Sequence, residues 1–143
     1  MMKNVLKITK SDLDVNFFYI GAVDVANEFD GSIKIDGALG LVKFKTSLKA
    51  KGSIEIESGT FIEAGWSIKA GTSIKAGESI KAGWSIKAGL QISAKWISAG
   101  FRIFAGLCDW KVPKEEETEI QAELRGGTIS FGKHVPPQKE PTA

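Results

Sequence analysis

The chain has 143 residues, of which 43% are hydrophobic and 25% are charged, and its formal net charge is +2. These values predict one soluble globular domain. They exclude a net positive charge large enough to attract nucleic acid or membranes strongly. The single cysteine excludes an internal disulfide framework. No apolar run approaches the roughly 20 residues of a membrane span, and the N-terminal residues lack the apolar core of a secretory signal. We therefore expect a cytoplasmic protein without membrane contact.

The first part of the chain, residues 1–58, carries irregular β signals, and we expect it to form irregular early coils or an N-terminal β cap. Residues 17–25 are rich in aromatic and branched side chains, which is typical of a strand. Residues 31–37 and 52–58 alternate apolar and polar side chains between turn residues, and 41–51 alternates too. A cap is needed because an open sheet edge exposes backbone groups that pair with other chains.

From Gly59 the chain repeats a unit of six residues, as in GWSIKA and GTSIKA. A period of six fits neither a helix nor one long strand, but it is typical of short strands broken by corners. Each isoleucine, and the alanine two residues later, would face a core that stacked coils share. Glycine suits the corner, through a positive φ or a close backbone approach. One copy, KWISA, has only five residues, and the spacing of six then resumes.

Residues 59–111 therefore predict an all-β fold, a single-stranded parallel β-helix or β-solenoid. Trp66 and Trp84 lie three hexads apart, so a triangular coil of three hexads would stack them on one edge. A flattened coil of two hexads would instead place Trp66 over Glu78. We favour three hexads per coil. The pattern leaves the handedness open. A left-handed coil would resemble the hexapeptide-repeat β-helix, although lysine follows the isoleucine where that motif has a small or acidic residue.

Beyond the repeat, residues 112–132 predict a loop and a β segment. Residues 114–119 are strongly charged and predict a solvated loop or a short helix, and Pro113 breaks strand pairing. Residues 120–124 and 128–131 then predict two strands that could fold back over the last coil. The polar, proline-rich residues 133–143 predict a disordered tail.

The tandem IxAG hexads are followed by RIFAGLCDW at 102–110, a proline, a run of glutamates and a GGTISFG strand. Over residues 31–132 this pattern resembles small hexapeptide-like repeat β-helix proteins of bacteria and their phages. That family supplies no catalytic residues. Its phage context implies an inhibitor that binds a host defence complex, as anti-CRISPR proteins do.

Two sets of side chains are candidates for binding a partner. The lysines of the repeat either keep it soluble or form a surface for phosphate or an acidic protein. In a coil of three hexads, only two of the four would share a face. The tryptophans occupy a variable position that also accepts glutamate, so we expect a partly exposed edge with interface anchors or packing under a flank. The candidate residues are Lys69, Lys75, Lys81, Lys87, Trp66, Trp84 and Trp96.

We expect no catalytic residue, no metal site and no cofactor. Cys108 and His134 fall short of the four ligands usual for zinc, and a catalytic pair would need proximity and an orienting partner. Cys108 is expected to be a small buried hydrophobe. The glutamates within 115–119 lack the interleaved glycine and aspartate of a calcium loop, which favours a solvated loop or a partner contact.

The sequence thus predicts a non-enzymatic protein that binds a partner protein on a rigid solenoid surface. One alternative is a self-assembling scaffold, similar to bactofilin polymers, in which solenoid edges join as a homo-oligomer. A second is a hexapeptide-repeat acyltransferase, whose trimers place a histidine near the subunit interface. The only histidine here lies outside the repeat, which disfavours it. Nucleic acid binding through the lysines is a less favoured partner choice.

Overall fold

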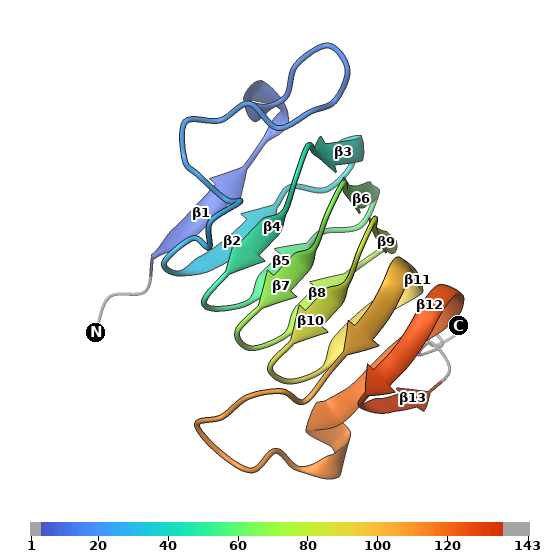
Figure 1. Cartoon of the computed structure of the whole chain (residues 1–143). Coiled ribbons are helices and arrows are strands. Elements are labelled where there is room, and N and C mark those ends of the chain that lie inside the picture. The colour runs from blue at the N-terminus through green and yellow to red at the C-terminus, as the bar shows by residue number, and fades with distance from the viewer. Residues whose placement is uncertain (1–3, 136–143) are drawn as a thin grey trace, which may run out of the picture.

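The computed structural model describes residues 4–135, and these form a parallel β-solenoid, as the hexad repeat predicts (Figure 1). The 13 strands of the described residues belong to one sheet that winds around a single core. Successive coils stack along the axis, from the N-terminal loop at one end to the last two strands at the other.

The strands pair in three columns, which are the three faces of the solenoid. Face A consists of β1 (Val5–Ile8), β2 (Ser32–Ile35), β5 (Ile54–Ile56), β8 (Ile74–Ala76) and the start of β11 (Ile92–Phe104). Face B consists of β3 (Gly40–Phe44), β6 (Thr60–Ala64), β9 (Ser79–Ala82) and the middle of β11. Face C consists of β4 (Leu48–Ala50), β7 (Ile68–Ala70), β10 (Ile86–Ala88) and the end of β11.

The strand register confirms three hexads per coil. Ile68 pairs with Ile86 and Ile74 pairs with Ile92, which is an offset of three full hexads in both cases. The five-residue copy shortens the next step, because Ile80 pairs with Ile97. A flattened coil of two hexads is therefore wrong for this chain.

The core is built from the inward positions that the hexad predicts. In the strands β7, β8 and β10, the isoleucine and the alanine two residues later are buried, whereas the lysine between them is exposed. Full burial of each isoleucine contributes roughly 1.5–3 kcal/mol as an upper range. Because one hexad cannot enclose this apolar face alone, the free energy comes from stacking neighbouring coils.

The regularly spaced glycines mark places where consecutive coils nearly touch. A Cβ atom on Gly83 would overlap the carbonyl oxygen of Gly65, and one on Gly89 would overlap the carbonyl oxygen of Gly71. These glycines of the repeat do not have a positive φ, unlike Gly59 and Gly106 at its two ends. Of the two reasons that the sequence offers for glycine at the corner, close backbone approach therefore applies within the regular repeat.

The N-terminal loop, residues 9–30, takes the place of a first irregular coil and also caps that end of the solenoid (Figure 1). The strand predicted over residues 17–25 is wrong. Residues 17–25 form only isolated bridges, from Phe18 to Lys43 and from Tyr19 to Leu13, and Phe29 forms a further bridge to Ala50. The Asp24 carboxylate accepts hydrogen bonds from the next residues, including the Ala26 amide at 2.8 Å, and such local bonds turn a chain away from a ladder.

At the other end, β12 (Glu119–Phe131) runs through both predicted strands without a break and pairs with β11 along its length. The predicted short helix is present as the 3-10 helix η2 (Glu115–Thr118). The prediction of a disordered tail is wrong for its first three residues. They form β13 (Lys133–Val135), which pairs with Glu119–Gln121 after a positive-φ corner at Gly132. The rest of that predicted tail, 136–143, lies outside the described residues.

Candidate binding surface

The aromatic edge, defined as Trp66, Trp84 and Phe101, lies at the corner between faces B and C. The Trp84 amide donates to the Trp66 carbonyl and the Phe101 amide donates to the Trp84 carbonyl, each at 2.8 Å. These backbone bonds hold the three side chains in a column, one per coil. The indole rings of Trp66 and Trp84 stack with centroids 5.2 Å apart and an interplanar angle of 5°.

Part of each stacked indole remains open to solvent. Trp66 and Trp84 remain 47% and 50% exposed despite the stacking, and Phe101 is exposed as well. Consecutive coils are fixed at a strand spacing of about 4.8 Å. A sugar ring or a base therefore has no room between the two indoles. The edge is instead suited to packing against apolar groups of a protein, where aromatic anchors contribute most of the affinity.

Trp96, the third candidate tryptophan, does not belong to this edge. The five-residue hexad removes one corner position, so Trp96 lies on face B and pairs with Ser79 rather than with Glu78. Its ring is partly buried and is covered by the Arg125 guanidinium, whose carbon lies 4.8 Å from the ring centroid.

The four candidate lysines are spread over the three faces. Lys75 on face A pairs with Glu55, and Lys81 on face B pairs with Glu63, so the signs of these neighbouring charges alternate. Lys69 and Lys87 are direct neighbours on face C, as expected for a coil of three hexads.

Face C extends this pair into a lysine column, defined as Lys49, Lys69 and Lys87. Lys49 pairs with Lys69 in register, although sequence reasoning did not group them. The step between these two exceeds three hexads, because the earlier coils are longer. A strict count of hexads could not find this neighbour. The signal available was the alternation over residues 41–51, which places Lys49 outward on a strand.

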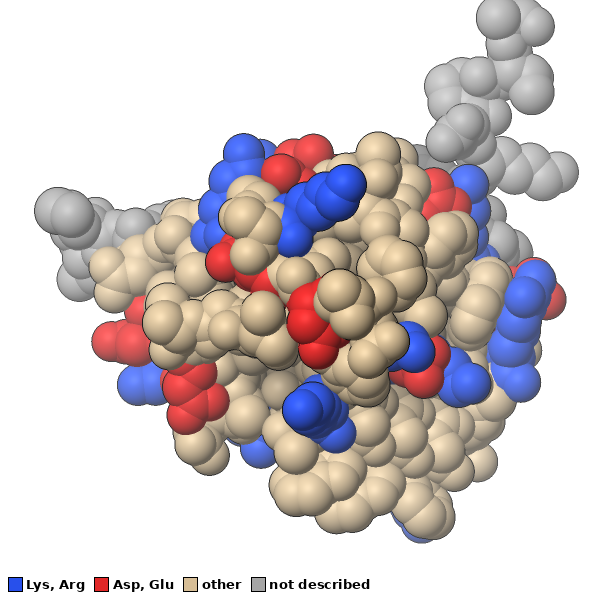
Figure 2. All heavy atoms as spheres, turned by 90° about the horizontal axis from the view of Figure 1, so that it is seen from above, with Lys and Arg blue, Asp and Glu red and all other residues tan. Residues whose placement is uncertain are grey.

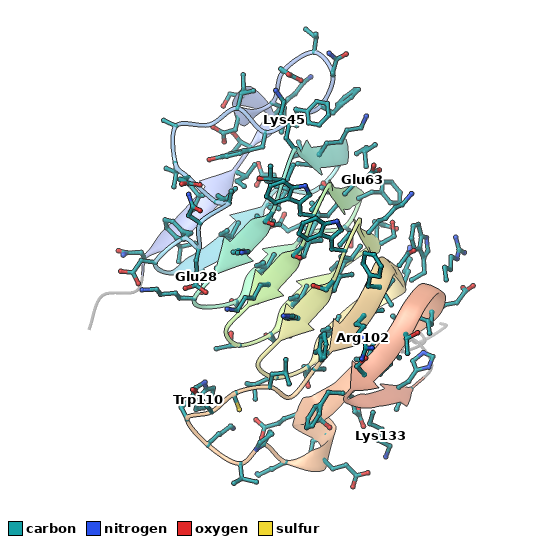
Figure 3. All side chains as sticks on the ribbon, viewed as in Figure 1. Glu28, Lys45, Glu63, Arg102, Trp110 and Lys133 are labelled. Atoms are coloured by element: carbon teal, nitrogen blue, oxygen red, sulfur yellow. The ribbon has the colours of Figure 1, made fainter. Side chains whose placement is uncertain are left out.

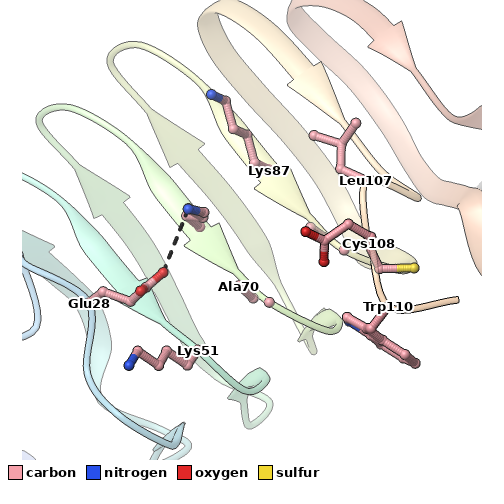
Figure 4. A pocket seen from close by; sticks show the side chains of 12 residues that line it. Glu28, Lys51, Ala70, Lys87, Leu107, Cys108 and Trp110 are labelled. Carbon is pink, nitrogen blue, oxygen red and sulfur yellow. Dashed lines mark ion pairs between the residues drawn. The ribbon is translucent and has the colours of Figure 1, made fainter.

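A cleft of about 360 Å³ opens at the border of face C that is remote from the aromatic edge. Its floor is formed by residues 70–71 and 88–89, and its walls include the lysines Lys51, Lys69 and Lys87. Figure 4 shows Glu28 and Lys51 on one side of the cleft, and the loop carrying Leu107, Cys108 and Trp110 on the other. Glu28 and Trp110 accordingly lie on the same side of the ribbon in Figure 3.

Glu28 projects onto the lysine column from the N-terminal loop. Its carboxylate lies 3.6 Å from the Lys69 ammonium, and the ion pair is drawn in Figure 4. The backbone of Glu28 has a φ of 82°, a left-handed conformation that is uncommon for residues other than glycine. Lys51, at the same border, pairs with Asp30 at 3.8 Å.

Cys108 and His134, the two residues considered for catalysis, form separate local contacts. The Cys108 thiol donates to the Lys111 carbonyl within its own loop and is only partly buried, so the expectation of a buried cysteine is wrong. His134 lies on β13, where Nε2 is 2.7 Å from the Ala122 carbonyl oxygen. Within residues 4–135, no group of three or more potential ligands could hold a metal ion.

The glutamates of η2 pair with lysines of the surrounding segments. Lys133 lies 2.8 Å from Glu115, and this bond lowers the pKa of the carboxyl group and raises the pKa of Lys133. Lys111 lies 2.7 Å from Glu117, whose pKa is lowered by that bond and by the Lys114 amide. These ion pairs connect η2 to Lys111 and Lys133. Two glutamates of the acidic run are therefore paired rather than only solvated.

The N-terminal end of the solenoid carries charges of both signs, interspersed with uncharged side chains (Figure 2). Among residues 4–135, no helix reaches the length and apolar character needed to cross a bilayer. A comparison of the chain with protein-family models, curated proteins and solved structures finds no match.

Proposed function

We propose that this protein is a non-enzymatic binding module that anchors a partner protein on the aromatic edge. The observation that carries the proposal is the stacked pair of Trp66 and Trp84, half-exposed on a corner where each backbone is fixed by the next coil. A rigid platform loses little conformational entropy on binding, so more of the contact free energy appears as affinity. Inhibition of a host defence complex is one form of this function, and its support is the resemblance of the hexads to phage proteins.

The alternative of an end-to-end polymer has less support. At the N-terminal end, the loop of residues 9–30 pairs with β3 and β4 through Phe18 and Phe29. It also covers β4 where the Lys49 amide donates to the Val25 carbonyl at 2.7 Å. A second solenoid could not extend faces B and C from this end without displacing the loop, because the edge groups it would need are already paired.

The proposal is tested by capture with matched variants. The biotinylated chain is incubated with a lysate of the source cells, captured proteins are identified by mass spectrometry, and the leading partner is purified for calorimetry. We expect the double variant Trp66→Ala/Trp84→Ala to bind this partner roughly 30-fold more weakly or worse, as for truncation of an interface hot spot. Phe61→Ala is the control, because Phe61 is an aromatic residue that is 41% exposed on face B, away from the aromatic edge and the cleft.

Circular dichroism and thermal unfolding of each variant show whether it retains the fold. Full affinity of the folded double variant would contradict the proposal. So would an equal loss for Phe61→Ala, because the effect would then not depend on the aromatic edge.

A further inference from the structure

Face C carries a longer uninterrupted run of lysines than faces A and B. On face A, Lys7 and Lys34 are neighbours, but they pair with the carboxylates of Asp36 and Glu57, and Glu55 separates Lys34 from Lys75. On face B, Glu63 separates Lys43 from Lys81. On face C, Lys49, Lys69 and Lys87 follow one another in register without an intervening carboxylate. Like charges on adjacent strands repel, so this column lowers the stability of the empty protein. Three lysines follow one another here, and among the ion pairs of the described residues only Lys69 of the three has a carboxylate partner, which points to an anionic ligand on this face.

The charges around the column limit the shape of that ligand. Glu28 contacts Lys69 from the N-terminal loop, and Asp109 lines the cleft from the opposite wall. A long polyanion running along the solenoid axis would meet both carboxylates and would be repelled. A short anionic group that enters between the two loops would meet Lys69 and Lys87 instead. The geometry also disfavours single-stranded nucleic acid, because the stacked indoles leave no gap for a base.

The aromatic edge and the lysine column are parts of one surface. Trp66 and Lys69 belong to one hexad, and Trp84 and Lys87 belong to the hexad directly above it. Between the tryptophans and the lysines, Ser67 and Ser85 are joined by a side-chain hydrogen bond of 3.2 Å. A partner anchored by apolar groups on the edge therefore extends naturally over the lysines.

We propose that face C binds a short, carboxylate-rich segment of the partner protein, and that Glu28 is the intramolecular competitor for that segment. This inference rests on the proposed function for its partner, but the charge argument is independent of the tryptophans. Glu28 already places a carboxylate at Lys69, in a strained backbone conformation, where a carboxylate of the ligand would bind. Binding then exchanges one ion pair for another and releases the N-terminal loop contact.

The test uses an acetylated hexaglutamate peptide as the probe, with hexaglutamine and an oligothymidylate as comparisons. Amide signals of the isotope-labelled protein are followed by NMR during titration. We expect hexaglutamate to shift signals of β7 and β10, the effect to weaken with added salt, and hexaglutamine to have no effect. The response should vanish in Lys69→Ala/Lys87→Ala and persist in Lys75→Ala/Lys81→Ala. The second variant is the matched control, because it removes the same charge on the other two faces from hexads that differ only in the residue after the glycine.

The Glu28→Gln variant tests whether Glu28 competes with the acidic peptide for Lys69. We expect it to bind hexaglutamate about two- to fivefold more tightly, the affinity equivalent of one exposed ion pair. Unchanged or weaker binding by Glu28→Gln would overturn the competitor role. Equal losses in the two lysine variants would overturn the site, and tighter binding of oligothymidylate on β7 and β10 would replace the acidic segment by nucleic acid.

The tryptophan variant keeps the two proposals distinguishable. Trp66→Ala/Trp84→Ala should respond to hexaglutamate as the unmodified chain does, because neither indole lines the cleft. If partner capture is unaffected by this variant while hexaglutamate still binds face C, the aromatic edge fails as an anchor and the acidic site stands. If capture depends on the tryptophans while hexaglutamate does not bind, the acidic site fails alone.

Discussion

Glu78 occupies the corner between faces A and B, where consecutive coils differ in length. The inward residues that flank this corner are Ile56 and Ile62 in one coil but Ala76 and Ile80 in the next, so the chain takes a shorter path. The Gly59 amide therefore donates to the Glu78 carboxylate, at 3.0 Å, rather than to a backbone carbonyl. Lys95 from the following coil completes the arrangement, with its ammonium 3.0 Å from the same carboxylate. One side chain thus joins three coils.

These bonds make the stability of the protein depend on the protonation of Glu78. The Lys95 ammonium first, and the Gly59 amide second, lower the pKa of Glu78 in the folded state. The stabilisation is therefore fully present above the pKa of the unfolded chain, and it is lost as the pH falls through the lower pKa of the folded state. We expect Glu78→Gln to lower the free energy of unfolding at neutral pH and to reduce its decline toward acid pH. Urea unfolding at a series of pH values measures both.

Glu57→Gln is the control for this measurement, because Glu57 forms an exposed ion pair with Lys34 at 3.5 Å. Such pairs contribute little in water. If the two variants showed the same pH dependence, the joining role of Glu78 would be contradicted.

At the scale of the repeated element, close approach of consecutive corners sets the composition of the hexad. Gly65, Gly83 and Gly100 follow one another in adjacent coils, and each would collide with the carbonyl of the coil before it if it carried a side chain. The isoleucine and alanine fill the inside of the coil, while the lysine lies outside; the serine is half-buried or, at Ser79, buried. The variable residue after the glycine is therefore the position at which the repeat can change its surface without changing its core.

Replacing a glycine in this column should be costly in proportion to the backbone overlap. We expect Gly83→Ala to lower the free energy of unfolding by about 2–3 kcal/mol, because the coils must separate to admit the methyl group. Gly40→Ala is the comparison, since a Cβ there meets nothing within 4 Å and the cost of about 1–2 kcal/mol arises from its positive φ of 73°. Urea unfolding followed by far-UV circular dichroism ranks the two. A loss at Gly83 no greater than at Gly40 would contradict close approach as the reason for glycine.

Sequence periodicity predicts the part of the fold that repeats, and it fails where the period changes. The spacing of Trp66 and Trp84 correctly predicts their stacking, because the coil between them consists of three complete hexads. The same count misplaces Trp96, because one missing residue moves it to another face. It also misses Lys49 as a neighbour of Lys69, because that coil is longer than three hexads. The cleft could not be predicted at all, since its walls are loops whose positions depend on tertiary contacts.

At the scale of the whole molecule, the N-terminal loop determines whether β3 and β4 present an open edge at that end of the solenoid. Val25 is buried at 4% exposure, and its carbonyl accepts the Lys49 amide of β4. Phe29 adds two more backbone hydrogen bonds along this strand. Its amide donates to the Lys49 carbonyl, and its carbonyl accepts from the Lys51 amide. The loop thereby covers β4 with irregular chain instead of another strand, so this face of the sheet cannot continue into a second molecule from the N-terminal end. The loop also carries Glu28, so the same segment covers the sheet edge and pairs with Lys69.

Displacing this loop should convert the protein into a self-associating one. Val25→Asp introduces a carboxylate at a buried position, where an unpaired charge is strongly unfavourable, so the loop is expected to leave the edges of β3 and β4 exposed. We expect light scattering to show a mass that rises with protein concentration, whereas the unmodified chain keeps one mass over the same range. Val15→Asp is the matched control, because Val15 is 91% exposed in the same loop. A Val25→Asp protein that stays folded and keeps the mass of the control would show that the loop is not what prevents edge pairing.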